Sequence, residues 1–453
     1  MGRMGEMGSL GRSQAQISTK SWHGTTACVG RNFLIGDDTL ATPPAGLGAI
    51  ECTPRAIRMR PANWARRIAT AVLFAWTIAT GPSCARSQQV LTRIRLDAPV
   101  ATAAISPTGR LVAAVVGRSV QKSDGSWTNS EDLEVFDPSA AKIIAKVEIP
   151  ISGWTDSPPS FNGFVGYCDS GRYLAAYDGL GTVYVVDPES YRVERTVGLE
   201  KLPTRGALGM RRVACSSQAS ILLVSDAGSD YGWGHLAVYD IASGKLLSEA
   251  RQNAQSGVEF GPVSISPNGS KAAVLLQNPR WKLIEGPDVE IRNTRDLKVA
   301  GYISTGDLAS DIAFAGNLQI VTSHGDGDPR PSKNFLRLWN AETGKELRRF
   351  SDPQFVTEGA INASADGRKL IAGIVKYRVC HLCDGLEGRI DVKEQRFSVW
   401  ETGTGAQLFR SEPLRPIIEP VGALCILSQD GNAVLIEWPH SEITPRVIHI
   451  PDH

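Results

Sequence analysis

From about residue 100 onward, hydrophobic and polar residues alternate in short runs, and turn-forming residues separate the runs. Alternation with a period of two predicts β-strands with one buried face. One longer pattern recurs: an apolar run, a Ser or related residue, a turn, usually with Gly, and a second apolar run. Its copies lie at 103–114, 165–176, 263–274, 361–373 and 425–435, with weaker copies at 213–225 and 312–323. Because Gly adopts the positive φ that closes a tight turn, the pattern predicts β-hairpins.

A second pattern follows each of the first six hairpins. It consists of an alternating strand, then Asp, Asn or Glu, then a turn and a fourth strand. The acidic or amide side chain can accept hydrogen bonds from backbone groups of the turn that follows. The copies begin with the segments at 133–138, 183–188, 236–247, 289–300, 336–350 and 397–409. Each repeat is therefore predicted to contain four antiparallel strands.

The spacing of the repeats predicts the fold. Equivalent positions at 106, 168, 216, 266, 315, 364 and 428 are separated by 62, 48, 50, 49, 49 and 64 residues. Seven four-stranded units of this length predict an all-β, seven-bladed β-propeller of four-stranded antiparallel blades. The units resemble the blades of WD-repeat and YVTN-type propeller proteins of the exported, bacterial kind, as in LWNAETGKELRRF at 338–350. This resemblance covers roughly residues 90–450.

The resemblance is incomplete in one respect. The Gly-His dipeptide that is common in WD repeats is absent before every blade, and Trp stands at its expected position only at Trp339 and Trp400. The likeness therefore does not extend to the hydrogen-bond network that Gly-His supports in that family.

The last repeat predicts how the ring closes. It has predicted strands near 422–428, 432–438 and 444–450, but it lacks a fourth strand. The segment QVLTRIRL at 89–96 precedes the first repeat and resembles a fourth strand. We predict that 89–96 pairs with the C-terminal blade, because this pairing covers two sheet edges that would otherwise be open.

Insertions concentrate on one face of the predicted ring. The loops between second and third strands share this face with the links between successive blades, and we call it the loop face. Insertions fall there at 117–132, 226–234, 277–288, 324–333 and 376–394, and in a link at 150–160. Insertions on one face of a repeat fold often mark the face that binds a partner.

The inserted segments carry six aromatic residues. They are Trp127, Trp154, Tyr231, Trp233, Trp281 and Tyr377. Trp and Tyr are typical anchors of protein interfaces, so we predict that these residues bind a protein or peptide partner. The alternative is that each ring packs against the base of its own loop.

The N-terminal part predicts export. Basic residues at 60, 66 and 67 follow Met59, an apolar run of 13 residues occupies 68–80, and small residues follow at 83–85. This order is typical of a secretory signal peptide, and the run is shorter than the roughly 18 residues that a spanning helix needs. We predict a signal peptide at 59–85, a propeller at 86–453 and a periplasmic or secreted protein.

Two alternatives concern this N-terminal part. Residues 1–58 show no sustained period, and they are interpreted as an upstream read-through before a start at Met59 or as a disordered extension. Lipid attachment at Cys84 is the less favoured form of export, because Gly81 stands where a lipoprotein signal usually has Leu.

The charge distribution excludes one class of partner. The chain has a net charge of +1, made up of +5 in residues 1–85 and −4 in the remainder. Nucleic-acid binding requires a basic patch or stripe, so we expect no nucleic-acid partner. No later apolar run is comparable to 68–80, so we also expect no membrane span in the propeller.

The cysteines predict one disulfide. Cys380 and Cys383 lie close together in an inserted loop, and in an exported protein the simplest interpretation is a small disulfide that stiffens this loop. Cys168, Cys215 and Cys425 lie on or beside innermost strands of different blades. They are interpreted as buried free thiols, and no pairing among them is predicted.

Candidate chemistry is sparse. His324, Asp326 and Asp328 have an alternation that suits oxygen-ligated cations, but the ligand set is incomplete, so a solvated turn is the preferred interpretation. No nucleophile elbow, phosphate loop or dinucleotide fingerprint occurs in the sequence. We therefore predict no catalytic residue, no metal and no cofactor.

The sequence thus favours a monomeric, exported propeller that acts as a non-catalytic scaffold for a protein or peptide. The alternative is an enzyme of the propeller lactonase or quinoprotein type, with its site in the central channel. That likeness concerns the fold only and identifies no residue.

Overall fold

Strands form where the repeats predict them. In the computed structural model of the chain, the structure describes residues 91–93, 100–121, 127–149, 164–179, 181–199, 210–228, 233–252, 258–277, 286–324, 334–380, 389–414, 424–437 and 445–450. All of them belong to the unit Gly81–His453, one of two units into which the chain divides. In this described part, no helix has the length and apolar character that a membrane crossing requires.

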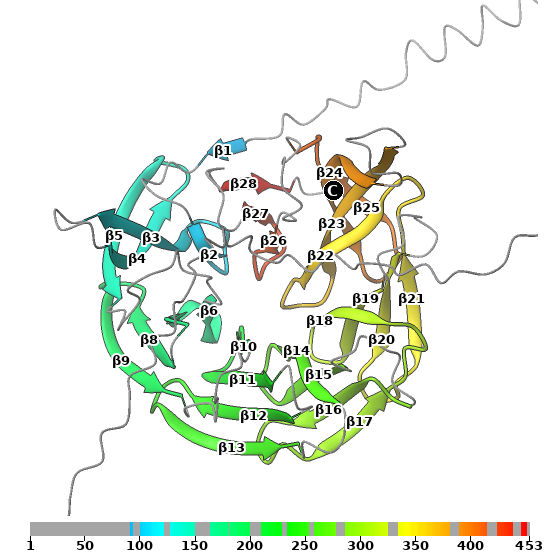
Figure 1. Ribbon diagram of the computed structural model, residues 1–453, viewed down its shortest axis with the longest axis horizontal. Coiled ribbons are helices and arrows are strands. Elements are labelled where there is room, and N and C mark those ends of the chain that lie inside the picture. The colour runs from blue at the N-terminus through cyan, green and yellow to red at the C-terminus, as the bar shows by residue number, and fades with distance from the viewer. Residues whose placement is uncertain are drawn as a thin grey trace, which may run out of the picture. The chain divides into compact units, whose positions relative to one another are not determined.

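The strands form seven antiparallel sheets of four, which we call blades 1 to 7 and which are arranged in a ring (Figure 1). The innermost strands are β2 (Val100–Ile105), β6 (Phe164–Cys168), β10 (Met210–Cys215), β14 (Glu259–Ile265), β18 (Ala309–Ala315), β22 (Val356–Ala363) and β26 (Leu424–Leu427). The second strands are β3 (Val112–Gln121), β7 (Tyr173–Tyr177), β11 (Ile221–Gly228), β15 (Lys271–Gln277), β19 (Gln319–His324), β23 (Lys369–Cys380) and β27 (Ala433–Glu437).

The outer half of each blade completes the sheet. The third strands are β4 (Trp127–Asp137), β8 (Thr182–Asp187), β12 (Trp233–Asp240), β16 (Val289–Asn293), β20 (Phe335–Asn340), β24 (Arg389–Glu401) and β28 (Arg446–His449). The outermost strands are β5 (Lys142–Ile149), β9 (Arg192–Gly198), β13 (Lys245–Arg251), β17 (Val299–Ile303), β21 (Glu346–Phe350), β25 (Gln407–Arg410) and β1 (Leu91–Arg93). A 3-10 turn, η2 (Asp169–Gly171), joins β6 to β7.

The predicted ring closure is confirmed. β1 pairs antiparallel with β28, with Leu91 opposite Ile448 and Arg93 opposite Arg446. The strand order of blade 7 is β26-β27-β28-β1, so the N-terminal strand supplies the outermost position of the C-terminal blade. This pairing covers the free edge of β28, where Val447 and Ile448 are buried.

The recurring Ser and Gly residues have definite roles in the turns between first and second strands. Ser364 Oγ accepts a hydrogen bond from the Lys369 backbone N–H at 3.0 Å, and Ser266, Ser106 and Ser428 make equivalent bonds. Gly367 of blade 6 has a φ of +72°, and a Cβ there would lie 2.6 Å from the backbone C and O of Ala315 in blade 5. The turn residues therefore close the hairpin and allow neighbouring blades to approach closely.

The polar residue after the third strand also has the predicted role. Asp187 Oδ1 accepts a hydrogen bond from the Glu189 N–H at 2.9 Å, and Asn340 Oδ1 accepts one from the Thr343 N–H at 2.8 Å. In Asp187 a hydrogen bond from the Ser190 hydroxyl lowers the pKa of the carboxyl. These side chains hold the turn into the outermost strand.

The core lies between blades rather than at one centre. Leu133 of blade 1 and Leu174 of blade 2 belong to one buried cluster, and Phe397 of blade 6 packs in another cluster with Ile448 of blade 7. Blade 7 and blade 1 share a further cluster that includes Val447 and Val112. Each blade is thus stabilised by apolar contacts with both neighbours, as expected for a repeat fold whose single units cannot bury their own faces.

Some residues expected in loops are in fact strands. The insertion at 117–132 continues the β3–β4 ladder as far as Gln121 opposite Trp127, and the insertion at 376–394 continues β23–β24 as far as Cys380 opposite Arg389. Backbone pairing satisfies the N–H and C=O groups of these segments, which an irregular loop would leave to water. The loop face therefore carries extended hairpins as well as connections.

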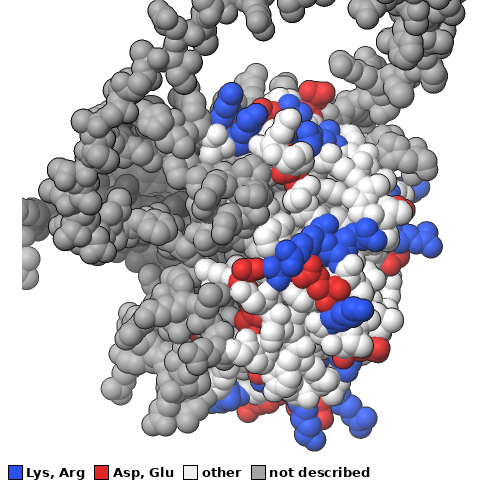
Figure 2. All heavy atoms as spheres, turned by 90° about the vertical axis from the view of Figure 1, so that its right-hand side faces the viewer, with Lys and Arg blue, Asp and Glu red and all other residues white. Residues whose placement is uncertain are grey.

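The flank of the ring near β21 has a mixed-charge surface. In Figure 2 a band of Lys and Arg side chains crosses this flank and borders Asp and Glu side chains. Within β21, Arg349 Nε donates to Glu346 Oε1 at 2.6 Å. Adjacent charges of opposite sign do not make the basic stripe that phosphate-backbone binding needs.

Candidate binding site in the central channel

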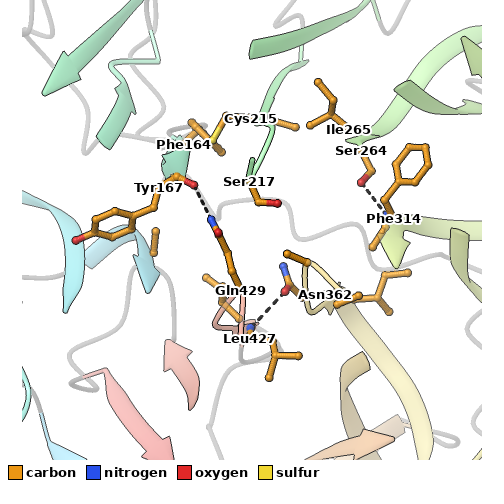
Figure 3. Close-up of a pocket in the computed structure, with 18 of the residues that line it drawn as sticks. Phe164, Tyr167, Cys215, Ser217, Ser264, Ile265, Phe314, Asn362, Leu427 and Gln429 are labelled. Carbon is orange, nitrogen blue, oxygen red and sulfur yellow. Dashed lines mark hydrogen bonds between the residues drawn. The ribbon is translucent and has the colours of Figure 1, made fainter. Parts of the chain in front are cut away.

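A cavity of about 540 Å³ lies in the channel, and all seven innermost strands contribute to its wall. Figure 3 shows apolar side chains such as Phe164, Ile265 and Phe314 around it, together with a few polar groups. The volume falls within the range of roughly 300–1,000 Å³ that is usual for small-molecule sites. The channel is therefore a candidate site for a small group with an apolar part.

Hydrogen bonds between blades fix the polar side chains of the wall. Ser264 Oγ accepts a bond from the Phe314 N–H at 2.9 Å, and Gln429 Nε2 donates to the Tyr167 carbonyl at 3.2 Å (Figure 3). The second bond joins blade 7 to blade 2 near the turns between first and second strands. Gln429 thereby helps to hold that end of the ring.

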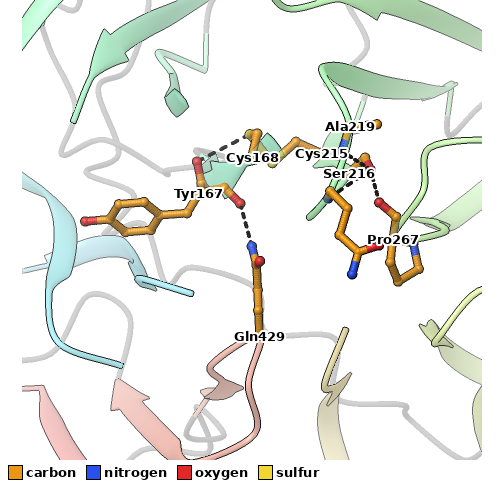
Figure 4. Close-up of a disulfide and its surroundings, with 9 residues drawn as sticks. Tyr167, Cys168, Cys215, Ser216, Ala219, Pro267 and Gln429 are labelled. Atoms are coloured by element: carbon orange, nitrogen blue, oxygen red, sulfur yellow. Dashed lines mark hydrogen bonds between the residues drawn. A yellow bond between two sulfur atoms is a disulfide. The ribbon is translucent and has the colours of Figure 1, made fainter. Parts of the chain in front are cut away.

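A disulfide joins Cys168 of blade 2 to Cys215 of blade 3, with a Cα–Cα distance of 5.7 Å (Figure 4). The expectation that these two cysteines remain unpaired was wrong. Both residues end an innermost strand, and neighbouring innermost strands lie side by side around the channel, so sequence separation between blades is no barrier to pairing. Cys425 is buried, as expected.

We expect peptide mapping to recover this bond. An unreduced digest should contain one species that joins the peptides of Cys168 and Cys215, and reductant should separate them. Alkylation of either residue in denatured, unreduced protein would contradict the pairing.

The wall of the channel contains a carboxylate at Asp311. Asp311 Oδ1 accepts a hydrogen bond from the Ile312 N–H at 2.9 Å, and Oδ2 accepts one from the Ile361 N–H of blade 6 at 3.0 Å. Burial raises the pKa of Asp311, while these bonds and the charge of Arg212 oppose the shift. The carboxylate is thus held in one orientation by backbone groups of two blades.

Arg212 links Asp311 electrostatically to a second buried carboxyl, that of Glu259. Arg212 stands in β10 directly before the wall residue Val213, and it interacts electrostatically with Asp311 and with Glu259 of β14. Glu259 is only 7% exposed, and its Oε2 accepts no hydrogen bond from any residue that the structure describes. Burial raises the pKa of Glu259, and Arg212 opposes the shift.

Arg212, Glu259 and Asp311 form an electrostatically linked set, of which only Asp311 lines the cavity. Its members come from three successive innermost strands. They lie near the start of these strands, on the side of the ring that carries the loop face. Sequence reasoning missed all three. The available signal was the presence of charge within innermost strands, but Arg211 stands beside Arg212 in β10, so charge alone did not single out a site.

His324 is a buried structural residue. Its Nε2 lies 2.6 Å from Thr322 Oγ1, which accepts a bond from Trp339 Nε1 at 2.7 Å, and its ring stacks on Phe335. Burial, followed by the charges of Arg337 and Arg349, lowers the pKa of His324 to about 3. Blade 5 therefore has a Trp–Thr–His network without a Gly-His dipeptide, and His324 does not lie in a solvated turn.

The aromatic residues predicted as anchors are only partly located. Trp127 begins β4 at the far end of the blade 1 hairpin, Trp233 begins β12, and Tyr377 lies half-buried in β23 beside a β-bulge. Trp154, Tyr231 and Trp281 lie outside the described residues. The located ones stand on the strand 2–strand 3 hairpins of three blades, and their role in binding stays a prediction.

The remaining candidates are likewise located in part. Cys380 ends β23, opposite Arg389, whereas Cys383, Asp326 and Asp328 lie outside the described residues. The small disulfide between Cys380 and Cys383 therefore stays a prediction. Across the described ranges, no group of three or more His, Cys, Asp or Glu side chains is placed to hold a metal ion.

The fold and the channel define this chain as a seven-bladed β-propeller protein. No protein-family model matches the chain, and no curated protein does. Among solved structures, it is similar to a chain of the mitotic checkpoint complex, with 14% identity, a TM-score of 0.49, and 80% of this chain and 92% of that chain covered. It is also similar to the Cps50 (Swd1) β-propeller domain of Myceliophteria thermophila, with 11% identity, a TM-score of 0.49, and 80% and 100% covered.

Proposed function

We propose that this propeller binds a protein or peptide through its loop face without catalysing a reaction on it. The observation that carries the proposal is the height of two hairpins on this face. Residues 117–121 of β3 and 376–380 of β23 extend beyond the start of their innermost strands and remain paired. Five strand residues correspond to a rise of about 17 Å.

The two hairpins stand on the two neighbours of blade 7. They belong to blades 1 and 6, while blade 7 between them has strands of only four, five and four residues in β26, β27 and β28. The paired hairpins give the loop face two projecting walls on either side of blade 7, between which a partner would bind. Trp127 and Tyr377, two of the predicted anchors, stand on these walls.

We further propose that the protein acts outside the cytoplasm, in the periplasm or after secretion, and that it does so as a monomer. The Cys168–Cys215 disulfide supports this location, because disulfides form and persist in oxidising compartments. The predicted signal peptide at 59–85 supports it independently.

Affinity capture with matched variants tests the binding face. Replacing Trp127, Trp154, Trp233 and Trp281 by Ala is expected to weaken partner binding by roughly 30-fold or more, since anchor truncations typically cost at least about 2 kcal/mol. The control replaces Leu246, Leu247 and Tyr302, which are exposed on outermost strands, and should capture the partner like the wild type. Equal capture by the wild type and the tryptophan variant would reject the loop face.

A further inference from the structure

Each innermost strand pairs with its second strand along one edge only, and its other edge faces the channel. In an antiparallel pair, residues that bond to the partner strand alternate with residues whose N–H and C=O groups point away from it. In blade 3 the Ser216 N–H donates to the Ile221 carbonyl at 2.9 Å, so position 216 is bonded toward β11. Val213 and Cys215 therefore direct their N–H and C=O groups into the channel, and both residues line the cavity.

In blades 5 to 7, side chains of the preceding blade satisfy N–H groups of this kind. Asp311 accepts the Ile361 N–H at 3.0 Å, and Ser264 accepts the Phe314 N–H at 2.9 Å. Asn362 makes the same kind of contact with an N–H of blade 7 at 3.4 Å. This part of the channel wall thus supplies its own acceptors.

Blade 3 receives no such acceptor from blade 2. The residues of blade 2 at the positions of Asp311 and Ser264 are Phe164 and Gly166, and neither has a side chain that can accept a hydrogen bond. A Cβ at Gly166 would lie 2.4 Å from Cζ of Phe164, so a side chain there would have to displace that ring. Across the described residues, the two channel-facing N–H groups of β10 have no side-chain acceptor.

Strand β10 is accessible from the channel and is held in place. Val213, Ala214 and Cys215 are all partly exposed, whereas residues 103–105, which occupy the same positions in β2, are buried. The disulfide to Cys168 fixes the end of β10 against β6. An edge that is ordered before binding loses less conformational freedom when a partner pairs with it.

The cavity beside β10 can hold a short extended chain. Cys215 lies between two apolar side chains, Phe164 of blade 2 and Ile265 of blade 4 (Figure 3). The cavity has a volume of about 540 Å³. Three residues of extended peptide span about 10 Å, and small apolar side chains gain free energy by leaving water for such a wall.

We propose that the open edge of β10 binds a short extended peptide segment of a partner chain by strand addition within the channel. The N–H groups of Val213 and Cys215 donate to peptide carbonyls, and their carbonyls accept from peptide N–H groups. The ladder accommodates about three residues with small apolar side chains. This site is separate from the loop face, where aromatic side chains on hairpins are the predicted anchors.

Ester analogues test the backbone pairing in the wild-type protein. The probe is acetyl-Ala-Val-Ala-N-methylamide, and two depsipeptides replace either the Val N–H or the following Ala N–H by an ester oxygen. Alternate N–H groups of a paired strand face its neighbour, so one depsipeptide should bind about 5-fold or more weakly in NMR titrations and the other should bind like the parent. Unchanged affinity of both, or an equal loss in both, would overturn strand addition.

Amide hydrogen exchange identifies the strand. The bound probe should slow the exchange of the Val213 and Cys215 amides, as followed by NMR, because each becomes hydrogen-bonded. The amides of Ala103 and Ile105, at the same positions in blade 1, should exchange at their unliganded rates. Slower exchange in β2 without slower exchange in β10 would contradict the assignment.

Substitution by Pro removes one donor of this edge. Val213→Pro deletes an N–H that points away from β11, so no ladder bond within the blade is lost, and probe binding is expected to weaken by about 5-fold or more. Ala103→Pro makes the same change at the same position of blade 1 and is the matched control, which should bind like the wild type. Wild-type affinity in Val213→Pro would rule out β10.

Two further measurements keep the test decisive. The unfolding temperatures of both Pro variants should stay close to that of the wild type, and if Val213→Pro does not fold, the depsipeptide comparison in the wild type decides alone. The tryptophan variant of the loop face should bind the probe with unchanged affinity, and loss of probe binding there would overturn a separate channel site. Partner capture and probe binding are thus independent measurements, so either proposal can fail alone.

Discussion

Deletion of residues 89–96 is expected to destabilise the propeller by about 3 kcal/mol or more, because it removes the ladder between β1 and β28 and its several hydrogen bonds. The deletion also exposes the edge of β28, next to the buried side chains of Val447 and Ile448. Thermal unfolding followed by circular dichroism measures the effect. A variant that lacks residues 1–80 retains β1 and should unfold at the wild-type temperature.

Rescue in trans makes the ring-closure test specific. A synthetic peptide of residues 86–99 should restore the unfolding temperature of the deletion variant by adding a strand to the open edge, whereas a scrambled peptide should not. A deletion variant as stable as the wild type would show that the β1–β28 ladder contributes nothing measurable.

Gly367→Ala is expected to be strongly destabilising, by roughly 2–5 kcal/mol. Two effects add. The φ of +72° disfavours any residue with a Cβ, and the Cβ would lie 2.6 Å from backbone atoms of Ala315 in blade 5. Backbone atoms cannot rotate away, so the two blades must separate or the turn must change.

Gly306→Ala is the matched control for this substitution. Gly306 has the same φ of +72°, but a Cβ there would meet no atom within 4 Å. This variant should lose only the conformational part, about 1–2 kcal/mol. Chemical denaturation of both variants measures the difference, and equal losses would show that the contact with Ala315 does not constrain the blades.

Much of the fold was predictable because each blade repeats the same turns and the same short-range hydrogen bonds. Ser364 and Gly367 occupy a turn whose geometry is local, and Asn340 bonds to the turn that immediately follows it. The closing strand was predictable for another reason: the last repeat lacked one strand, and an unassigned strand stood at the other end of the chain.

The extended hairpins were missed because the local signal was ambiguous. Polar residues such as Ser119 and Asn129 dominate the inserted segments. These segments lack the alternation of apolar and polar residues that predicts a strand, so their sequence predicts a loop. In the structure, Ser119 pairs with Asn129 as part of a continuous ladder. Cross-strand pairing, which no single segment reveals, decided their conformation.

The candidate site was largely hidden from sequence for a geometric reason. Arg212, Glu259 and Asp311 stand in separate repeats, and their significance depends on which residues the ring places beside them. The disulfide between Cys168 and Cys215 follows the same logic. Cys168 and Cys215 end adjacent innermost strands, and the ends of adjacent innermost strands are neighbours in a ring.

The closing strand also governs the order in which the chain folds. Leu91 and Ile448 pair across nearly the whole length of the ring, so this contact has the largest loop-closure entropy in the propeller. Contacts of such long range form slowly. Until Arg446–His449 is in place, the folded portion is an open arc with an unpaired strand edge at each end, and such edges can pair with other chains.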